Sequence, residues 1–210
     1  IETRPVSELQ IGDVIRVLPA LFALREHFPT ARIDWVVEAR SANILEGNPA
    51  LNGLLIFNRS GNFVRDTREF LKLMDAVRRG GYGLVLDFHG IFKSGLLCMA
   101  SKAARRVGFS RPRAQEGSWL FLNERVSLPS SRLNRIEENL ELARAVGARR
   151  GVLDVLIAVA PEIQMEVESW FEEKFDSGKL LVAVHAPVER PEKQWPPEYF
   201  AELCDLLLSD

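Results

Sequence analysis

Several classes of protein are excluded by what this sequence lacks. It contains two cysteines among 210 residues, and neither Cys98 nor Cys204 has a CxxC partner or a neighbouring histidine. Both lie in apolar stretches with helical spacing, which indicates reduced core thiols in a cytoplasmic protein rather than a disulfide framework. We expect no metal site, because clusters of metal-ligating residues are missing as well.

An excess of charge of one sign is also missing, as are long apolar runs. The chain has 27 Lys and Arg against 29 Asp and Glu, so no basic field indicates nucleic acid as a partner. No apolar run approaches the roughly 18 to 20 residues that span a bilayer. The first residues lack the charged, apolar and small-residue regions that follow one another in a secretion signal. Ile1 opens the chain and a predicted helix stops at Asp210, so we expect a fragment of a longer protein.

Common nucleotide-binding motifs and repeats do not occur either. The absence of GxGxxG and GxxxxGK[ST] argues against dinucleotide-dependent hydride transfer and against P-loop ATPases. No internal repeat of roughly 20 to 50 residues and no low-complexity tract is found, which sets aside solenoids and disordered tails.

What is present is an alternation of apolar strand-like runs with amphipathic helices. The hydrophobic share of 47% is sufficient for a core. The patterns predict helices through 18–28, 70–79, 91–104 and 136–146, and strands at 32–39, 54–57, 83–88 and 105–109. The run at 83–88 is almost wholly apolar, as is typical of a parallel strand covered on both faces. The alternation predicts an α/β sheet.

A second unit is predicted from about residue 160. Residues 153–159 close the first part, and an acidic amphipathic helix follows Pro161. A strongly apolar strand is predicted at 179–187, and a further helix begins after the sequence WPP. We therefore expect a first domain at 1–158, and at 159–210 a linker helix with the truncated start of a second domain.

In open α/β sheets, ligands bind where strands end and helices begin. The first such turn holds Gly12 and Asp13. An aspartate at a helix start is most often an N-cap, worth about 1 kcal/mol, and spacing alone favours that interpretation. The alternative is a general base, which needs a cleft and a proton to accept. Pro19 is compatible with a kink in the helix or with its true start.

Three further turns carry groups suited to anions. His89 and Lys93 follow the strand at 83–88, and a lysine one turn into a helix suits an anionic ligand. Residues 105–113 contain four arginines, whose forks bind carboxylate or phosphate bidentately. Lys193 precedes a helix, where the helix dipole would help it to hold phosphate. For each turn the alternative is a solvated surface charge or a structural residue.

Four segments in this order resemble the lipopolysaccharide heptosyltransferases of glycosyltransferase family nine: GDVIRVLPAL, FPTARIDWVVE, YGLVLDFHGIFKSGLL and HAPVERPEKQWPPEYFAEL. The resemblance covers nearly all of residues 10–210. It implies a GT-B fold of two Rossmann-like, doubly wound domains, the second incomplete in this chain. The acceptor would lie on the first domain and the nucleotide-sugar donor on the second.

The resemblance also implies roles for single residues. Asp13 falls on the family's Gly-Asp motif, whose aspartate is the proposed base for the acceptor hydroxyl, and Lys193 falls on the lysine that holds the donor pyrophosphate. The other positions that match donor contacts are Gly12, Pro187 and Val188, and those that match acceptor contacts are Lys93, Arg111, Arg113 and Arg59. The implied reaction transfers heptose from ADP-heptose to a Kdo sugar of Kdo-lipid A, inverts the anomeric carbon and requires no metal or other cofactor.

The implied setting is the cytoplasm of a Gram-negative bacterium, with the enzyme peripheral at the inner membrane, where it meets its lipid acceptor. We expect the 210-residue chain alone to be inactive. Two other hypotheses stay open: a non-catalytic module that binds anions or sugars without a complete donor domain, and a structural α/β domain with incidental surface charge.

Overall fold

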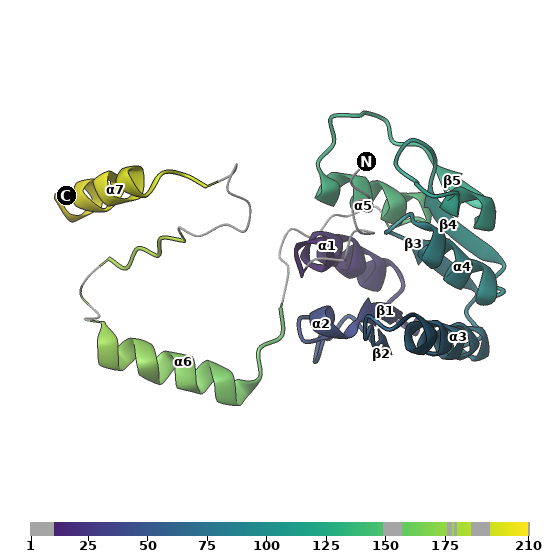
Figure 1. The fold of residues 1–210 in the computed structure, drawn as a ribbon, viewed down its shortest axis with the longest axis horizontal. Coiled ribbons are helices and arrows are strands. Elements are labelled where there is room, and N and C mark those ends of the chain that lie inside the picture. The colour runs from purple at the N-terminus through teal and green to yellow at the C-terminus, as the bar shows by residue number, and fades with distance from the viewer. Residues whose placement is uncertain (1–10, 149–156, 176–177, 179, 186–193, 210) are drawn as a thin grey trace. The chain divides into compact units, whose positions relative to one another are not determined.

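The computed structural model describes residues 11–148, 157–175, 178, 180–185 and 194–209 (Figure 1). The chain divides into two compact units, Ile1–Ala160 and Pro161–Asp210. Pro187, Val188 and Lys193, three of the predicted donor contacts, lie outside the described residues. The remaining predicted site residues all belong to the first unit.

The first unit alternates helices and strands, as the sequence predicts. In chain order the elements are α1 (Ile11–His27), β1 (Asp34–Glu38), α2 (Ala39–Ala42), β2 (Gly53–Phe57), α3 (Phe63–Arg79), β3 (Leu84–Asp87), α4 (Phe92–Ala100), β4 (Arg105–Phe109), the 3-10 helix η1 (Ser118–Phe121), β5 (Glu124–Val126) and α5 (Arg135–Ala145). The short elements α2, η1 and β5 were not predicted. The α/β class is confirmed.

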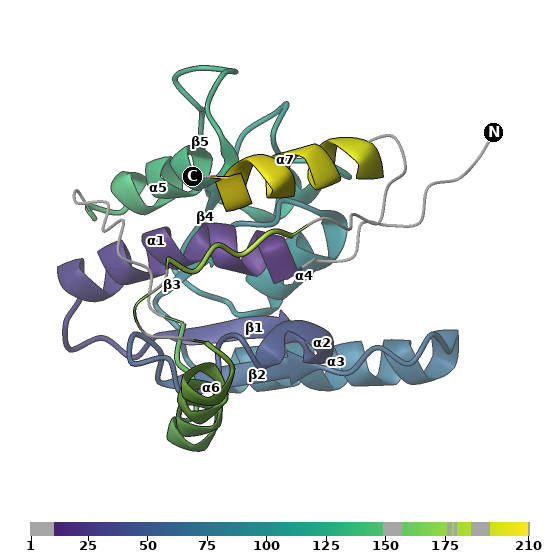
Figure 2. The same cartoon turned by 90° about the vertical axis from the view of Figure 1, so that its left-hand side faces the viewer.

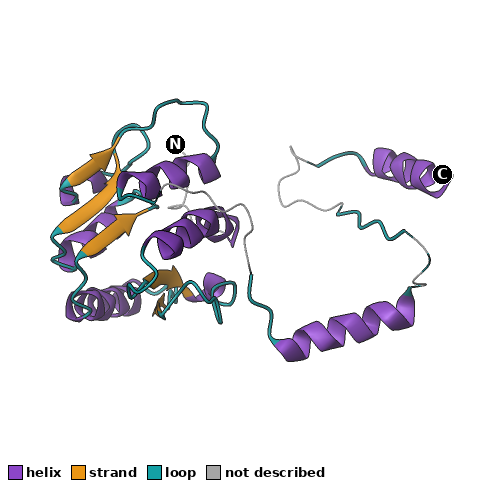
Figure 3. Cartoon of the chain, turned by 180° about the vertical axis from the view of Figure 1, so that it is seen from behind, coloured by secondary structure: helices purple, strands orange, loops and turns teal. Residues whose placement is uncertain are grey.

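The strands form two parallel sheets. β1 pairs with β2, with Asp34 opposite Gly53, and β3, β4 and β5 pair in that order. Among the described residues no strand ladder joins β1 to β3. Helices cover both faces of these strands, with α1 and α5 on one side and α3 and α4 on the other (Figures 1 and 3).

α1 is the helix against which both sheets pack. Its inner face contributes Leu18 and Leu21 to a core with Val37 of β1, and Ala20, Ala23 and Leu24 to a core with β4 and α5. The helix continues through Pro19, which is buried within it. Asp13 is the third residue of α1 in the described chain. The N-cap interpretation of Asp13 is therefore wrong, because Ile11 and Gly12 before it are already helical.

Arg25 ties the carboxyl-terminal end of α1 to the connections around β1 and β2. Its Nη1 donates to the carbonyl of Ala31 at 2.7 Å, with longer bonds to those of Phe28 and Pro29. Its Nε donates to Ala50 O and its Nη2 to Asn52 Oδ1, at 3.1 and 2.7 Å. One guanidinium thus fixes the end of the helix to two loops.

β3 differs from its prediction in burial. Leu84, Val85 and Leu86 are only partly buried, although the apolar run predicts a strand covered on both faces. The reason is that all three line a cavity between β3 and β1.

The second unit contains α6 (Pro161–Lys174) and α7 (Pro197–Ser209), both of which were predicted. The strand predicted at 179–187 is not formed over its described part, residues 180–185, which has no regular structure. Leu180 is 92% exposed. An apolar run forms a strand only where a neighbouring strand satisfies its backbone, and no described residue pairs with this one.

Candidate functional site

A cavity of about 810 Å³ lies between β1 and β3, and α1, α3, α4 and α5 contribute to its walls. Three of the predicted site residues line it, namely Asp13, Lys93 and Arg113. Gly12 precedes Asp13 on α1, and a Cβ added there would meet no atom within 4 Å. Arg111 and Arg59 do not line the cavity. We call the end of the cavity beside Asp13 and His89 the mouth.

Asp13 is well placed to act on a ligand at the mouth. Its side chain is 46% exposed and forms an ion pair with Arg16, one helical turn later, at 3.0 Å. The residue stands in the first turn of α1, where the helix dipole favours the charged carboxylate. The Asp13 carboxylate is therefore accessible to a ligand, lies beside a cation and stands at the carboxyl ends of the strands.

His89 shares the mouth with Asp13. Burial lowers the pKa of His89, whereas the charges of Asp87 and Asp13 oppose that shift. Both side chains line the same cavity. A histidine with a lowered pKa is largely neutral near pH 7, so its ring can accept or donate a hydrogen bond.

Asp87 shapes the turn that carries His89. Its Oδ1 accepts hydrogen bonds from the backbone N–H groups of His89 and Gly90, at 3.1 and 2.9 Å. Gly90 has a φ of +72°, a left-handed conformation that favours glycine. Asp87 is 3% exposed. Burial raises the pKa of Asp87, and the hydrogen bond from the Gly90 N–H opposes the rise.

Arg113 is held by the protein itself. Its Nε donates to Glu138 Oε2 at 2.9 Å, and its Nη1 and Nη2 donate to the carbonyls of His89 and Phe88, both at 3.2 Å. Burial lowers the pKa of Arg113. Three of the five N–H donors of a guanidinium are thus engaged, so Arg113 positions the turn after β3 and keeps two donors for a ligand.

Lys93 and Arg135 add positive charge around the cavity. Lys93 is the exposed second residue of α4, next to the amino-terminal end of that helix. Arg135 is the first residue of α5 and donates to Glu138 at 2.6 Å. With Arg113, Arg16 and Arg32 they give five cations in the cavity wall, which suits a ligand with carboxylate or phosphate groups.

The structure separates Arg111 and Arg59 from this group. The guanidinium of Arg111 lies 4.4 Å from the ring centroid of Trp119, as a cation–π pair. Arg59 is exposed in the loop after β2, where its charge helps to lower the pKa of Asp66. Sequence proximity placed Arg111 and Arg113 in one cluster, but only Arg113 lines the cavity.

Most lining residues were not among the predicted site residues, and the polar ones include Asp87, Glu38, Arg135 and Asn139. Asn139 is 3% exposed and donates through Nδ2 to the carbonyl of Arg16 at 3.0 Å, which ties α5 to α1. Its Oδ1 has no hydrogen-bond partner in the structure. Asp87 and Glu38 each end a strand, a signal that could have indicated them, whereas Asn139 lies mid-helix and offered none.

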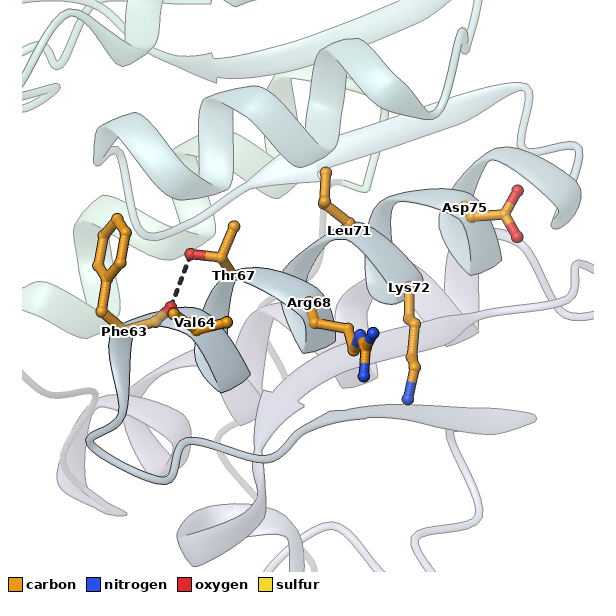
Figure 4. A pocket seen from close by; sticks show the side chains of 7 residues that line it. All are labelled: Phe63, Val64, Thr67, Arg68, Leu71, Lys72 and Asp75. Carbon is orange, nitrogen blue, oxygen red and sulfur yellow. Dashed lines mark hydrogen bonds between the residues drawn. The ribbon is translucent and has the colours of Figure 1, made fainter.

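A second hollow lies on the outer side of α3 (Figure 4). The exposed side chains of Phe63, Val64 and Leu71 line it with charged neighbours from the same helix, and Thr67 donates to the Phe63 carbonyl at 2.7 Å. No predicted site residue contributes to it. The cavity between β1 and β3 is therefore the candidate site.

Two features are absent from the part of the chain that the structure describes. None of the helices in that part of the chain is both long and apolar enough to cross a membrane. Within the same residues, no three His, Cys, Asp or Glu side chains are grouped so that they could hold a metal ion.

Comparison with known proteins points to one group of enzymes. The chain is 21% identical over 196 residues to lipopolysaccharide core heptosyltransferase OpsX of Haemophilus influenzae, covering 93% of this chain and 54% of that protein. It is 26% identical over 209 residues to lipopolysaccharide heptosyltransferase 1 of Escherichia coli K12, covering 96% and 63%. The chain thus spans less than two thirds of either relative.

Two solved structures have a fold similar to that of this chain. A glycosyl transferase family 9 protein from Veillonella parvula matches with a TM-score of 0.77 at 18% identity, over 94% of this chain and 56% of that one. Escherichia coli heptosyltransferase WaaC with ADP matches with a TM-score of 0.69 at 23% identity, over 94% and 62%. The model of glycosyltransferase family 9 (heptosyltransferase) matches residues 70–210. Since that match covers more than half of the chain, this protein belongs to glycosyltransferase family 9, the heptosyltransferases.

Proposed function

We propose that the protein to which this chain belongs transfers heptose from ADP-heptose to a Kdo sugar of the lipopolysaccharide inner core. The first unit would bind the Kdo-lipid A acceptor, and the second would begin the donor domain of a GT-B enzyme. The observation that carries the proposal is the position of Asp13, half exposed at the mouth of a cavity with five cations in its wall. Family membership favours an enzyme over a non-catalytic binding module.

In this mechanism Asp13 is the general base. Its carboxylate takes the proton of the acceptor hydroxyl as the oxygen forms a bond to the anomeric carbon of the heptose. The bond from that carbon to the ADP oxygen breaks, and its electron pair leaves with ADP. Attack from the face opposite ADP inverts the anomeric configuration, and the step balances without a metal or cofactor.

The cations bind and orient the substrates. Kdo carries a carboxylate, and Lys93 with the remaining donors of Arg113 would hold it close to Asp13. Arg111 and Arg59 would contact acceptor groups outside the cavity. Lys193, with Pro187, Val188 and Gly12, would hold the donor phosphates and stabilise the departing ADP. The acceptor would be met at the inner membrane surface by a peripheral, cytoplasmic enzyme.

The decisive variant is Asp13→Asn, which keeps size and hydrogen bonding but removes the base. In the protein with its complete donor part, we expect the rate of ADP release with Kdo-lipid A to fall about 10² to 10⁴-fold, with acceptor affinity nearly unchanged. Asp75→Asn is the matched control, because Asp75 is also an exposed helical carboxylate paired with an arginine, Arg79. An unaffected rate in Asp13→Asn would exclude Asp13 as the base.

A further inference from the structure

α3 carries apolar side chains on the face that is directed away from the sheets. Its inner face packs against β2 through Leu73 and Val77. On the outer face, Phe63 is 85%, Val64 76% and Leu71 60% exposed, and the three line one hollow. The packing of the first unit does not explain them, and exposed apolar side chains that gather in one patch are typical of an interaction surface.

The helical repeat sets these apolar side chains beside cations. Two rows with a spacing of four residues make up the outer face: Phe63, Thr67 and Leu71 in one, and Val64, Arg68 and Lys72 in the other. In Figure 4 the first row points to one side of the helix, whereas Arg68 and Lys72 point to the other. An apolar strip therefore runs along a basic edge. We call these six residues, together with Arg65, the α3 face.

Positive charge is concentrated around the α3 face. Residues 59–79 contain six Lys or Arg and three Asp or Glu, whereas the whole chain has an excess of acidic residues. Each of the three carboxylates already has a partner within this segment. Arg65 and Arg68, by contrast, have no ion-pair partner in the described part of the chain. A partner of the α3 face should therefore be negatively charged.

The α3 face begins at the edge of the first unit that carries the mouth. Tyr82, just before β3, donates a hydrogen bond to Asp34 at the start of β1, so both strands begin at one edge and end at the other. Residues 58–62 lead from the carboxyl end of β2, which is parallel to β1, into α3 (Figure 2). α4 packs beside α3, begins after β3 and brings Lys93 into the cavity wall.

An anionic bilayer matches both properties of the α3 face. Side chains such as Phe63 and Leu71 insert at the boundary between acyl chains and headgroups, while arginine and lysine are attracted to anionic headgroups. A second copy of this chain would bring like charges together across a two-fold axis. A free phosphate would leave the apolar side chains in water.

We propose that the α3 face docks the protein on an anionic phospholipid bilayer, with α3 lying along the membrane surface. This inference rests on the proposed function, because a lipid-linked acceptor is reached from a bilayer. Docking through α3 would keep the mouth close to the acceptor sugars, whereas the residues of the α3 face take no part in proton transfer. Only three apolar side chains insert, so the binding is reversible and depends on salt.

The experiment measures co-sedimentation of the 210-residue chain with two kinds of vesicle. One contains phosphatidylcholine and phosphatidylglycerol in equal amounts, and the other phosphatidylcholine alone. We expect binding to the anionic vesicles to be about tenfold or more tighter at about 0.1 M salt, and to weaken about tenfold or more at about 0.5 M. Neither vesicle contains a Kdo sugar, so the measurement is independent of heptose transfer, and Asp13→Asn should bind as wild type does.

Protein variants locate the contact. Phe63→Ser and Arg68→Glu should each weaken binding to the anionic vesicles about fivefold or more. The matched controls are Ile56→Ser and Arg144→Glu, which should change it less than about twofold. Ile56 is exposed on β2 between two residues that pack toward α3, so it points to the opposite face. Arg144 is exposed near the end of α5, on the other side of the sheets.

Several results would overturn the proposal. They are absence of binding, equal binding to both kinds of vesicle, and equal losses in the control variants. Dimers of this chain in gel filtration that Phe63→Ser dissociates would also do so, because the α3 face would then join two copies. If vesicle binding fails while Asp13→Asn still abolishes transfer, the docking surface is wrong and the proposed function stands.

Discussion

The hydroxyl of Tyr82 donates a hydrogen bond of 2.6 Å to Asp34 Oδ2, across 48 positions of the sequence. Asp34 is almost completely buried and also pairs with Arg32 at 2.9 Å. The contact joins the start of β1 to the start of β3, and no strand ladder reinforces it. One side chain thus connects the two sheets at the end of the cavity away from the mouth.

Tyr82→Phe is expected to lower the free energy of unfolding by about 1 kcal/mol at neutral pH, because the hydrogen bond to Asp34 is lost. Burial and that hydrogen bond raise the pKa of Tyr82 to about 12 from an ordinary value of 10.0. As pH rises above 10, the unfolded chain releases this proton before the folded chain does, so the contribution of Tyr82 to stability declines between pH 10 and 12.

The measurement is urea denaturation of both proteins from pH 7 to 12. The difference in free energy of unfolding between wild type and Tyr82→Phe should shrink between pH 10 and 12. Tyr199→Phe is the matched control, since Tyr199 is the other tyrosine of the chain and is exposed on α7. A pH-independent difference for Tyr82→Phe would contradict the assigned pKa.

Asp87→Asn is expected to stabilise the fold at pH 7. The amide oxygen can still accept the hydrogen bonds from His89 and Gly90, while the buried charge is removed. Because the pKa of Asp87 is raised in the folded state, the unfolded chain releases the proton first, and wild-type stability falls as pH rises above the ordinary value of 3.8. The difference in free energy of unfolding between Asp87→Asn and wild type should therefore grow from about pH 4 upward.

Denaturant midpoints between pH 4 and 8 test this expectation. Asp87→Ala serves as the comparison. It removes the acceptor of the His89 and Gly90 hydrogen bonds and should lower the free energy of unfolding by about 1 to 3 kcal/mol. If Asp87→Asn is less stable than wild type at pH 7, the carboxylate is stabilised by its neighbours and the expectation is wrong.

Arg113→Lys should destabilise the first unit far more than Arg111→Lys. Lysine cannot reproduce the fork that reaches Glu138, His89 and Phe88 together, and we expect a loss of about 2 kcal/mol or more from this largely buried pair. Arg111 is exposed and stacks on Trp119, so its replacement should cost about 0.5 kcal/mol. Urea unfolding of the two variants measures both losses in the free energy of unfolding. Equal losses would contradict the structural role assigned to Arg113.

Gly12→Ala should leave the fold intact and change the site. The added methyl group would meet no atom within 4 Å, and alanine in a helix is favoured over glycine by about 0.5 to 1 kcal/mol. A rise in melting temperature together with weaker substrate binding would support a role for Gly12 at the site. Gly95→Ala is the contrast, because its Cβ would lie 2.6 Å from the Phe121 ring and destabilise the chain.

The sequence predicted most of the fold of the first unit because its apolar periodicities are strong. The stripe of α1 and the runs that become β1 and β4 led to the right elements. β5 was missed because its three residues, Glu124–Val126, carry two charges and little apolar pattern. The apolar run at 180–185 was predicted as a strand, but strand formation depends on a partner that periodicity cannot reveal.

The candidate site was predicted in part. The rule that ligands bind at the carboxyl ends of strands brought Asp13 and His89 together correctly, and with them Lys93. It could not separate Arg113 from Arg111, because the directions of side chains two residues apart depend on tertiary contacts such as the Glu138 ion pair. Asn139 was missed for the same reason, as its role arises from packing between α5 and α1.

The bonds of Arg25 have a consequence for Asp13. The two residues stand on the same helix, roughly 18 Å apart at 1.5 Å per residue, and Arg25 secures the end of α1 remote from the mouth. Arg25 therefore fixes α1 at the end opposite Asp13, and the bond from Asn139 to the Arg16 carbonyl holds it close to Asp13. In the proposed mechanism, a substitution that releases Arg25 from its loops would lower the rate by misplacing Asp13, although it would touch neither substrate.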